Sequence, residues 1–185
     1  LPYNGEESRA SREAAVVFKE LEGRALGENP MGTVELANRL GACPLAFHPG
    51  EYWMYGTSAD VLGAVVEVVS GKRFGEFLQE EFFSPLGMKD AGFFVPKEKQ
   101  GRLSKAYTKT PNGLREYTGH HLGIFREHTQ APAFESGGAG LFATIDDYMR
   151  FGRMLLNNGE LEGKRVLSPR TVEYMTTGAL ISCQQ

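Results

Sequence analysis

Apolar residues recur every three to four positions in several stretches of the chain, which is the spacing of one helix face. The first stretch predicts a helix over residues 8–22, with Gly23 after its end; its apolar positions are Ala14, Val17, Phe18 and Leu21. A shorter helix is predicted to follow Thr33, whose hydroxyl is a candidate N-terminal cap, and to run to Gly41.

The strongest helical pattern begins at Thr57 or Ser58, either of which can cap the first turn, and ends at Ser70-Gly71. Asp60 lies in that turn, where the positive end of the helix dipole favours a carboxylate. The apolar stripe of this helix consists of Val61, Leu62, Val65, Val66 and Val69. The preceding residues 44–55 combine aromatic residues with two prolines and a glycine, which argues against regular structure.

Three more helices are predicted downstream. One runs from Phe74 to about Phe82 and ends at residues 85–87, one is capped by Thr144, and the last begins at Ser168-Pro169. The apolar face of the middle one consists of Ile145, Tyr148, Met149, Gly152, Leu155 and Leu156. Residues 97–135 are polar and weakly periodic, so we expect a long loop there that contains a hairpin turning at Asn112-Gly113.

The composition is that of an ordinary globular domain, and residues 1–185 are long enough for one domain. Hydrophobic residues make up 41% and charged residues 23%, which disfavours disordered, collagen-like and disulfide-scaffold proteins. The net charge of −3 offers no field for nucleic acid, and no stretch approaches the ~20 apolar residues of a membrane span. Cys43 and Cys183 lie far apart without metal-site spacing, which leaves both free thiols and a disulfide open.

Three blocks of the sequence resemble one family, in the same order and with similar spacing. The first block, residues 47–63, reads F-H-P-G-E-Y-W-M-Y-G-T-S-A-D-V-L-G. The second, residues 85–90, reads P-L-G-M-K-D, and the third, residues 136–151, reads S-G-G-A-G-L-F-A-T-I-D-D-Y-M-R-F, with L-S-P-R-T-V behind it. Over about residues 44–175 the chain resembles the serine β-lactamase and penicillin-binding-protein hydrolases, of the class C β-lactamase and esterase type.

The resemblance implies a nucleophilic serine and a lysine in S-x-x-K, together with a catalytic tyrosine. Tyr55 matches that tyrosine, and it stands just before a helix N-terminus, where negative charge on an oxygen is favoured. The alternative is one more packed aromatic beside Tyr52 and Trp53.

The substrate-binding residues implied by the resemblance are Thr57, Gly137 and Gly138. Thr57 stands where lactam-processing members tend to have asparagine, so ester or small amide substrates are favoured over β-lactams. A hydroxyl lacks the two donors of an amide, and Thr57 could equally be only a helix cap.

Several family motifs are missing. No serine is followed by lysine three residues later, and Lys109-Thr110 is followed by proline instead of the glycine of K-T-G. The two H-x-G triplets, at residues 48–50 and 121–123, precede the third block, whereas the family's follows it. The chain also opens at Leu1 without an initiator methionine.

We therefore expect an internal fragment of an α+β protein: the mainly helical subdomain of the β-lactamase/transpeptidase-like fold, with a small hairpin and most of the antiparallel sheet missing. Its partner would be the remainder of the parent chain, which carries the serine, the lysine and the closing sheet. The isolated fragment would be inactive, because a tyrosine without that serine and lysine has nothing to activate.

Other chemistry is poorly supported by the sequence. His120, His121 and His128 lie in a polar loop without carboxylates at ligand spacing, so we expect no metal, and no cofactor is implied. Residues 136–140 are not a nucleophile elbow, because Phe134 stands where glycine is required. The alternative function is a non-catalytic domain of the same fold that binds a peptide or protein partner, which an S-x-x-K upstream in the parent would disfavour.

Overall fold

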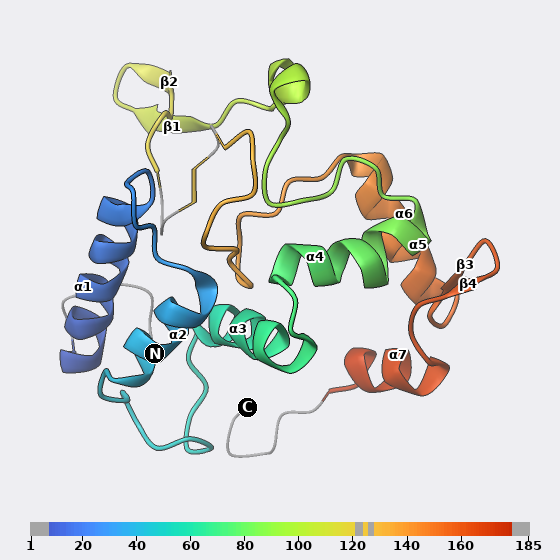
Figure 1. The fold of residues 1–185 in the computed structure, drawn as a ribbon, viewed down its shortest axis with the longest axis horizontal. Coiled ribbons are helices and arrows are strands. Elements are labelled where there is room, and N and C mark those ends of the chain that lie inside the picture. Colours follow the sequence, from blue (N-terminus) through green and yellow to red (C-terminus); the bar gives the residue numbers. More distant parts are fainter. Residues whose placement is uncertain (1–7, 121–123, 126–127, 179–185) are drawn as a thin grey trace.

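The computed structural model describes residues 8–120, 124–125 and 128–178 (Figure 1). Helix α1 (Arg9–Arg24) begins after Ser8, whose hydroxyl accepts the Ser11 N–H, and it runs one residue past the glycine that was expected to end it. Helix α2 (Thr33–Gly41) ends at the predicted residue but begins one residue earlier than predicted. Its cap was predicted wrongly: Thr33 is already the first helical residue, and its hydroxyl accepts the N–H of Glu135 instead.

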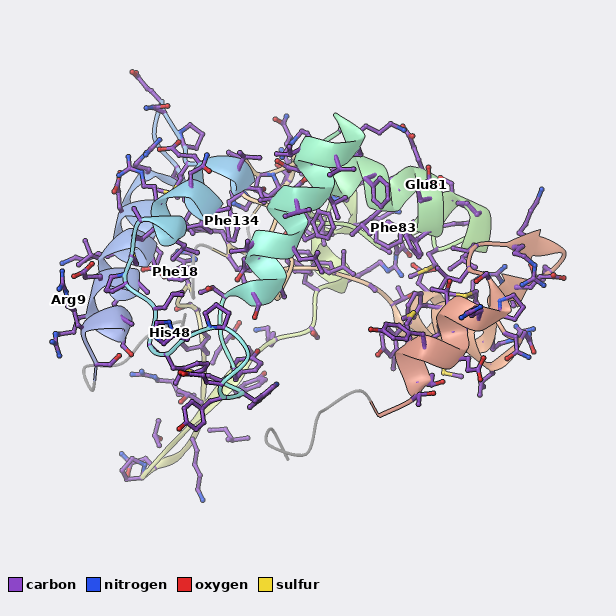
Figure 2. The ribbon with its side chains drawn as sticks, turned by 90° about the horizontal axis from the view of Figure 1, so that it is seen from below. Arg9, Phe18, His48, Glu81, Phe83 and Phe134 are labelled. Atoms are coloured by element: carbon purple, nitrogen blue, oxygen red, sulfur yellow. The ribbon has the colours of Figure 1, made fainter. Side chains whose placement is uncertain are left out.

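The first hydrophobic core lies between these two helices and the segment that contains Phe134. Figure 2 shows Phe18 and Phe134 on this side of the molecule. The core consists of Ala14, Phe18, Leu21, Met31, Leu36, Leu40 and Phe134. The predicted apolar face of α1 is therefore confirmed, because three of its four positions belong to this core and Val17 packs against it.

Helix α3 (Ser58–Ser70) packs against α2 and ends at Gly71, which has a positive φ of 69°. Most of the predicted apolar stripe is exposed, although Val61 packs against the first core. The fully buried residues of this helix are Asp60, Gly63 and Ala64, because small residues let neighbouring backbone approach closely. The exposed α3 face consists of Leu62, Val65, Val68 and Val69.

Helix α4 (Phe74–Leu78), the π-helical turn η1 (Gln79–Phe83) and helix α5 (Ser84–Leu86) form one helical run between the two ends of the molecule (Figure 1). The run ends within the predicted residues 85–87, but helical structure continues past Phe82 and through Pro85. Proline is disfavoured inside a regular helix because it has no backbone N–H to donate. Here Pro85 directly follows the wider π-helical turn η1. Gly87, with a φ of 68°, ends the run.

Residues 97–120 contain more structure than the predicted loop. A 3₁₀ helix, η2 (Lys97–Arg102), precedes an antiparallel hairpin of β1 (Tyr107–Thr110) and β2 (Gly113–Glu116). The hairpin is confirmed, but its turn lies one residue earlier than predicted, because Thr110 pairs with Gly113. Gly113 opens β2 with a φ of 110°, a conformation that glycine adopts readily.

The C-terminal part consists of helix α6 (Ile145–Leu156), the short antiparallel pair β3 (Glu160–Leu161) and β4 (Lys164–Arg165), and helix α7 (Pro169–Thr176). Both predicted caps are confirmed: Thr144 accepts the Asp147 N–H, and Ser168 accepts the Thr171 N–H. Helices α5 and α6 and strand β3 contribute to the second core, which includes Phe83 (Figure 2) and consists of Phe83, Leu86, Met88, Met154 and Leu161.

The predicted apolar face of α6 is largely turned outward. Ile145, Tyr148, Met149 and Leu156 are exposed, and Met154 faces the second core. The helix carries apolar side chains on two sides, so periodicity could not decide which side this core covers.

The mainly helical architecture is confirmed, and the described strands form only the two small antiparallel sheets β1–β2 and β3–β4. Among the residues that the structure describes, no helix has the length and apolar character that a bilayer crossing requires.

Candidate active site

Tyr55 lies near the end of the irregular segment 44–57, which leads into α3. The segment turns at residues 48–51, where the Glu51 N–H donates to the His48 carbonyl at 3.1 Å and Gly50 has a φ of 91°. The ring of Tyr52 packs edge-on against Phe47, with centroids 5.5 Å apart. Tyr55 is 70% exposed, so its side chain is not packed into either core.

Thr57 occupies the N-cap position of α3, two residues after Tyr55. Its side chain accepts no capping hydrogen bond from the helix, so this predicted cap is wrong. Thr57 is only 2% exposed, which places it inside the described part of the protein. Its contact with substrate stays a prediction.

The first turn of α3 is joined to the S-G-G turn, residues 136–139, by one buried carboxylate. Asp60 Oδ1 accepts the Ser136 hydroxyl at 2.5 Å and the Gly138 N–H at 3.2 Å. Ser136 Oγ in turn accepts the N–H groups of Gly138 at 3.2 Å and Ala139 at 2.9 Å. This network connects the first sequence block to the third.

Gly137 is needed for the close approach of this turn to α3. A Cβ on Gly137 would lie 2.0 Å from the Ala59 carbonyl oxygen and 2.8 Å from the carbonyl carbon. Gly63, on the same side of the helix, adds no side chain that would separate the two backbones. Because neither glycine has a side chain, the S-G-G turn can lie directly on the start of α3.

The second and third blocks are joined in a similar way. The carboxylate of Asp147, in the first turn of α6, accepts the N–H groups of Lys89 at 3.1 Å and Asp90 at 2.7 Å. The sequence alone gave no sign of this contact. All three blocks of the resemblance are thus connected through two buried aspartates, each the third residue of its helix.

Glu135 is a buried acid that sequence reasoning missed. It is 3% exposed; its Oε2 accepts the Gly75 N–H at 2.8 Å, and its Oε1 lies 3.2 Å from the Arg73 guanidinium. Burial raises the pKa of this carboxyl, and the Gly75 N–H and Arg73 offset only part of the increase. Its position directly before the S-G-G turn was the only sequence signal available.

A cavity of about 900 Å³ lies beside this acid, between α4, η1 and residues 89–96 and 141–145. Its walls include Arg73, Phe93, Glu135 and Phe142. Neither Tyr55 nor the two predicted substrate-binding glycines line it. It is therefore separate from the surface on which the predicted chemistry would take place.

The histidines of the polar loop pack against an aromatic ring. The ring centroids of His120 and His128 lie 4.1 and 5.5 Å from that of the buried Phe125. His121 and Cys183 lie outside the described residues. Within the described ranges, no three His, Cys, Asp or Glu residues are grouped as a metal ion would require.

A mainly helical fold that joins a tyrosine-bearing segment, a P-L-G-M-K-D segment and an S-G-G turn has the features of the penicillin-binding-protein and β-lactamase type of domain. The model of the family described as "Beta-lactamase" matches residues 8–182, so the chain belongs to this family.

The relatives include an uncharacterised protein of Mycobacterium tuberculosis, 36% identical over 147 residues, which covers 79% of this chain and 35% of that protein. Lovastatin esterase of Penicillium rubens is 34% identical over 134 residues, which covers 71% of this chain and 32% of the esterase. The chain therefore spans about a third of the length of the curated relatives that it matches.

Among solved structures, EstCE1, described as a hydrolase with promiscuous acyltransferase activity, matches with a TM-score of 0.66 and 24% identity. The match covers 91% of this chain and 44% of EstCE1. At this identity the likeness establishes the fold alone. The expected fold, the helical part of a β-lactamase-like domain, is confirmed.

Proposed function

We propose that these residues form the tyrosine-bearing part of a longer serine hydrolase (the whole protein), which cleaves small ester or amide substrates through an acyl-enzyme. The observation that carries the proposal is the attachment of the Tyr55 segment to the S-G-G turn through Asp60. Tyr55 is exposed at the start of the same helix, and a proton-transferring group must be accessible to substrate in this way.

In the proposed reaction, the serine of an S-x-x-K segment elsewhere in the whole protein attacks the substrate carbonyl. Tyr55, together with the lysine of that segment, takes up the serine proton while the new C–O bond forms, and a proton is then given to the departing alcohol or amine as the original acyl bond breaks. Water then attacks the acyl-enzyme in the same way, with its proton passing to the serine oxygen as the ester bond to the serine breaks and the acid is released. Tyr55 is the one member of this machinery that the chain itself would supply.

Two features favour an ester over a β-lactam. Thr57 replaces the asparagine that lactam-processing members tend to have, and the relatives include an enzyme described as an esterase. Gly137 and Gly138 would then contact the acyl or alcohol group through the backbone. The Gly138 N–H is already donated to Asp60 and Ser136, so we assign it no role as an oxyanion donor.

The remainder of the whole protein would cover the exposed α3 face (Leu62, Val65, Val68 and Val69). Four neighbouring apolar side chains on one helix are an unusual surface for a finished domain, since apolar area in water is unfavourable. The lengths of the curated relatives leave ample additional chain to cover it.

The decisive experiment compares Tyr55→Phe with Tyr52→Phe in the whole protein. Both tyrosines are exposed and lie three positions apart in the same segment. Each variant therefore removes one phenol hydroxyl from a similar environment. We expect Tyr55→Phe to lower kcat for p-nitrophenyl butyrate by roughly 10²- to 10⁴-fold, the usual contribution of a positioned proton-transfer group. Tyr52→Phe should stay within about twofold, a change too small for a group of that kind.

Near-normal turnover of Tyr55→Phe would remove the catalytic assignment. Failure of a fluorophosphonate to label the whole wild-type protein would instead favour the non-catalytic binding domain. The 185 residues produced by themselves should show no serine-reagent-sensitive turnover, and any such turnover would contradict the proposal.

A further inference from the structure

We propose that Asp60 is a positioning residue: through Ser136, its carboxylate fixes the S-G-G turn relative to Tyr55 and thereby sets how tightly substrate is held. The inference rests on the proposed function and extends it to a residue that touches no substrate. It concerns the contact between the first and third sequence blocks, which no part of the tyrosine chemistry explains.

The network has a defined donor direction. A carboxylate only accepts hydrogen bonds, so the Ser136 hydroxyl must donate to Asp60 Oδ1. The lone pairs of Ser136 Oγ are then left to accept the two backbone N–H groups of Gly138 and Ala139. The buried negative charge therefore determines the hydroxyl orientation that closes the turn.

Helix capping does not account for Asp60. Balancing the helix dipole does not require burial, whereas Asp60 is only 2% exposed. Its Oδ2 is buried, and no hydrogen bond to it is found within the described residues. A buried carboxylate with an unsatisfied oxygen is unfavourable for folding, which suggests that its retention serves the turn.

Asp147 is a buried aspartate at the equivalent helix position and serves as a comparison for Asp60. It is also a buried third residue of a helix, but both of its oxygens accept backbone N–H groups, those of Lys89 and Asp90. Those contacts brace one backbone segment against a helix and involve no side-chain hydroxyl. Asp147 is therefore a structural aspartate, against which a positioning role of Asp60 can be measured.

The position of the turn bears on Tyr55 because both are attached to the same helix start. Tyr55 precedes Asp60 by five positions, and Thr57 between them is the N-cap residue of α3. Gly137 touches the Ala59 backbone, so the turn has no room to move closer to the helix. Loss of the Asp60–Ser136 bond would let the turn, with Gly137 and Gly138, move away from the helix start, and substrate would be held less tightly there.

The test uses Asp60→Asn and Ser136→Ala in the whole protein, with Asp147→Asn as the control. An asparagine has the same shape, but its amide group can donate to Ser136 Oγ and displace one of the two N–H donors. We expect KM for p-nitrophenyl butyrate to rise roughly 5- to 10-fold in Asp60→Asn, the usual advantage of a charged over a neutral acceptor, with kcat within about threefold. Asp147→Asn should lower the unfolding midpoint but leave KM within about twofold, because its bonds only brace the backbone.

Ser136→Ala should reproduce the KM change, and the double variant Asp60→Asn/Ser136→Ala should be no worse than either single one, because both remove the same link. In all three, amide hydrogen exchange of a peptide that contains Gly138 and Ala139 should be about tenfold faster, since a broken hydrogen bond exposes its amide. Amide hydrogen exchange can be measured whether or not the protein is active, so this readout is independent of the proposed function.

An unchanged KM and unchanged exchange in Asp60→Asn and Ser136→Ala would overturn the inference while leaving Tyr55 in place. An equal KM rise in Asp147→Asn would also overturn it, because the effect would then be general destabilisation. If the wild-type protein itself has no turnover and no serine labelling, the proposed function fails, and the positioning role fails with it. Should Asp60→Asn not fold, Ser136→Ala decides alone.

Discussion

Substitution of Gly137 by alanine tests whether the S-G-G turn and helix α3 touch as closely as described. The new Cβ would lie 2.0 Å from the Ala59 oxygen and 2.8 Å from the Ala59 carbon. Ordinary van der Waals contact begins at 3.4 Å, so the backbones would have to separate by more than 1 Å. Both obstructing atoms belong to the main chain of a helix, so no side-chain rotation can relieve the overlap.

The expected loss of stability follows from this overlap. Inserting a methyl group into a packed contact destabilises a protein by about 1–3 kcal/mol when the surroundings must shift. Because the displaced segment carries Gly138 and the amides that Ser136 holds, KM for an ester substrate should increase as well. Gly23→Ala is the control: nothing lies within 4 Å of its Cβ, and alanine within α1 should add up to ~1 kcal/mol of stability.

The assay is urea unfolding of the whole protein, followed by circular dichroism, with ester hydrolysis measured in parallel. The predicted order of stability is Gly23→Ala, wild type, then Gly137→Ala. A Gly137→Ala protein with wild-type stability and wild-type KM would show that the turn does not rest on Ala59. The account of how the first and third sequence blocks are joined would then be wrong.

Two further predictions concern buried charge and exposed apolar area. Burial raises the pKa of Glu135 above its ordinary value of 4.5, so the folded state holds this proton more tightly than the unfolded state. The free energy of unfolding should therefore fall as pH rises from about 4.5 through the folded pKa, and Glu135→Gln should remove that part of the slope in urea titrations; identical slopes would refute the assignment. Leu62→Lys should destabilise the whole protein by about 1.5–3 kcal/mol, the usual contribution of a buried leucine, if other segments cover the exposed α3 face. Val16→Lys, at an equally exposed position on α1, should change stability by less than about 0.5 kcal/mol, and equal effects at the two sites would contradict that covering.

The sequence by itself determined the local elements. Ser8, Thr144 and Ser168 cap the helices that follow them, and Gly71 ends α3, because caps and positive φ values depend on the residue present and its immediate neighbours. The order and spacing of the three blocks also identified the family, which the comparisons confirm.

Only the tertiary structure decided which face of each helix is buried. Much of the apolar stripe of α3 and of α6 points away from the described cores, and small or polar residues such as Gly63 and Asp60 are inside. Periodicity reports that a helix has an apolar side, but the element that will cover that side can lie anywhere along the chain.

The contacts that hold the candidate site together were equally invisible in the sequence. Asp60 and Ser136 are 76 positions apart, and Glu135 and Gly75 are 60 apart. Such pairs form because a buried carboxylate must find donors wherever the fold brings them, and no local pattern records which donors those are. The sequence therefore established the elements and the family, and the packing of distant segments decided which polar groups meet.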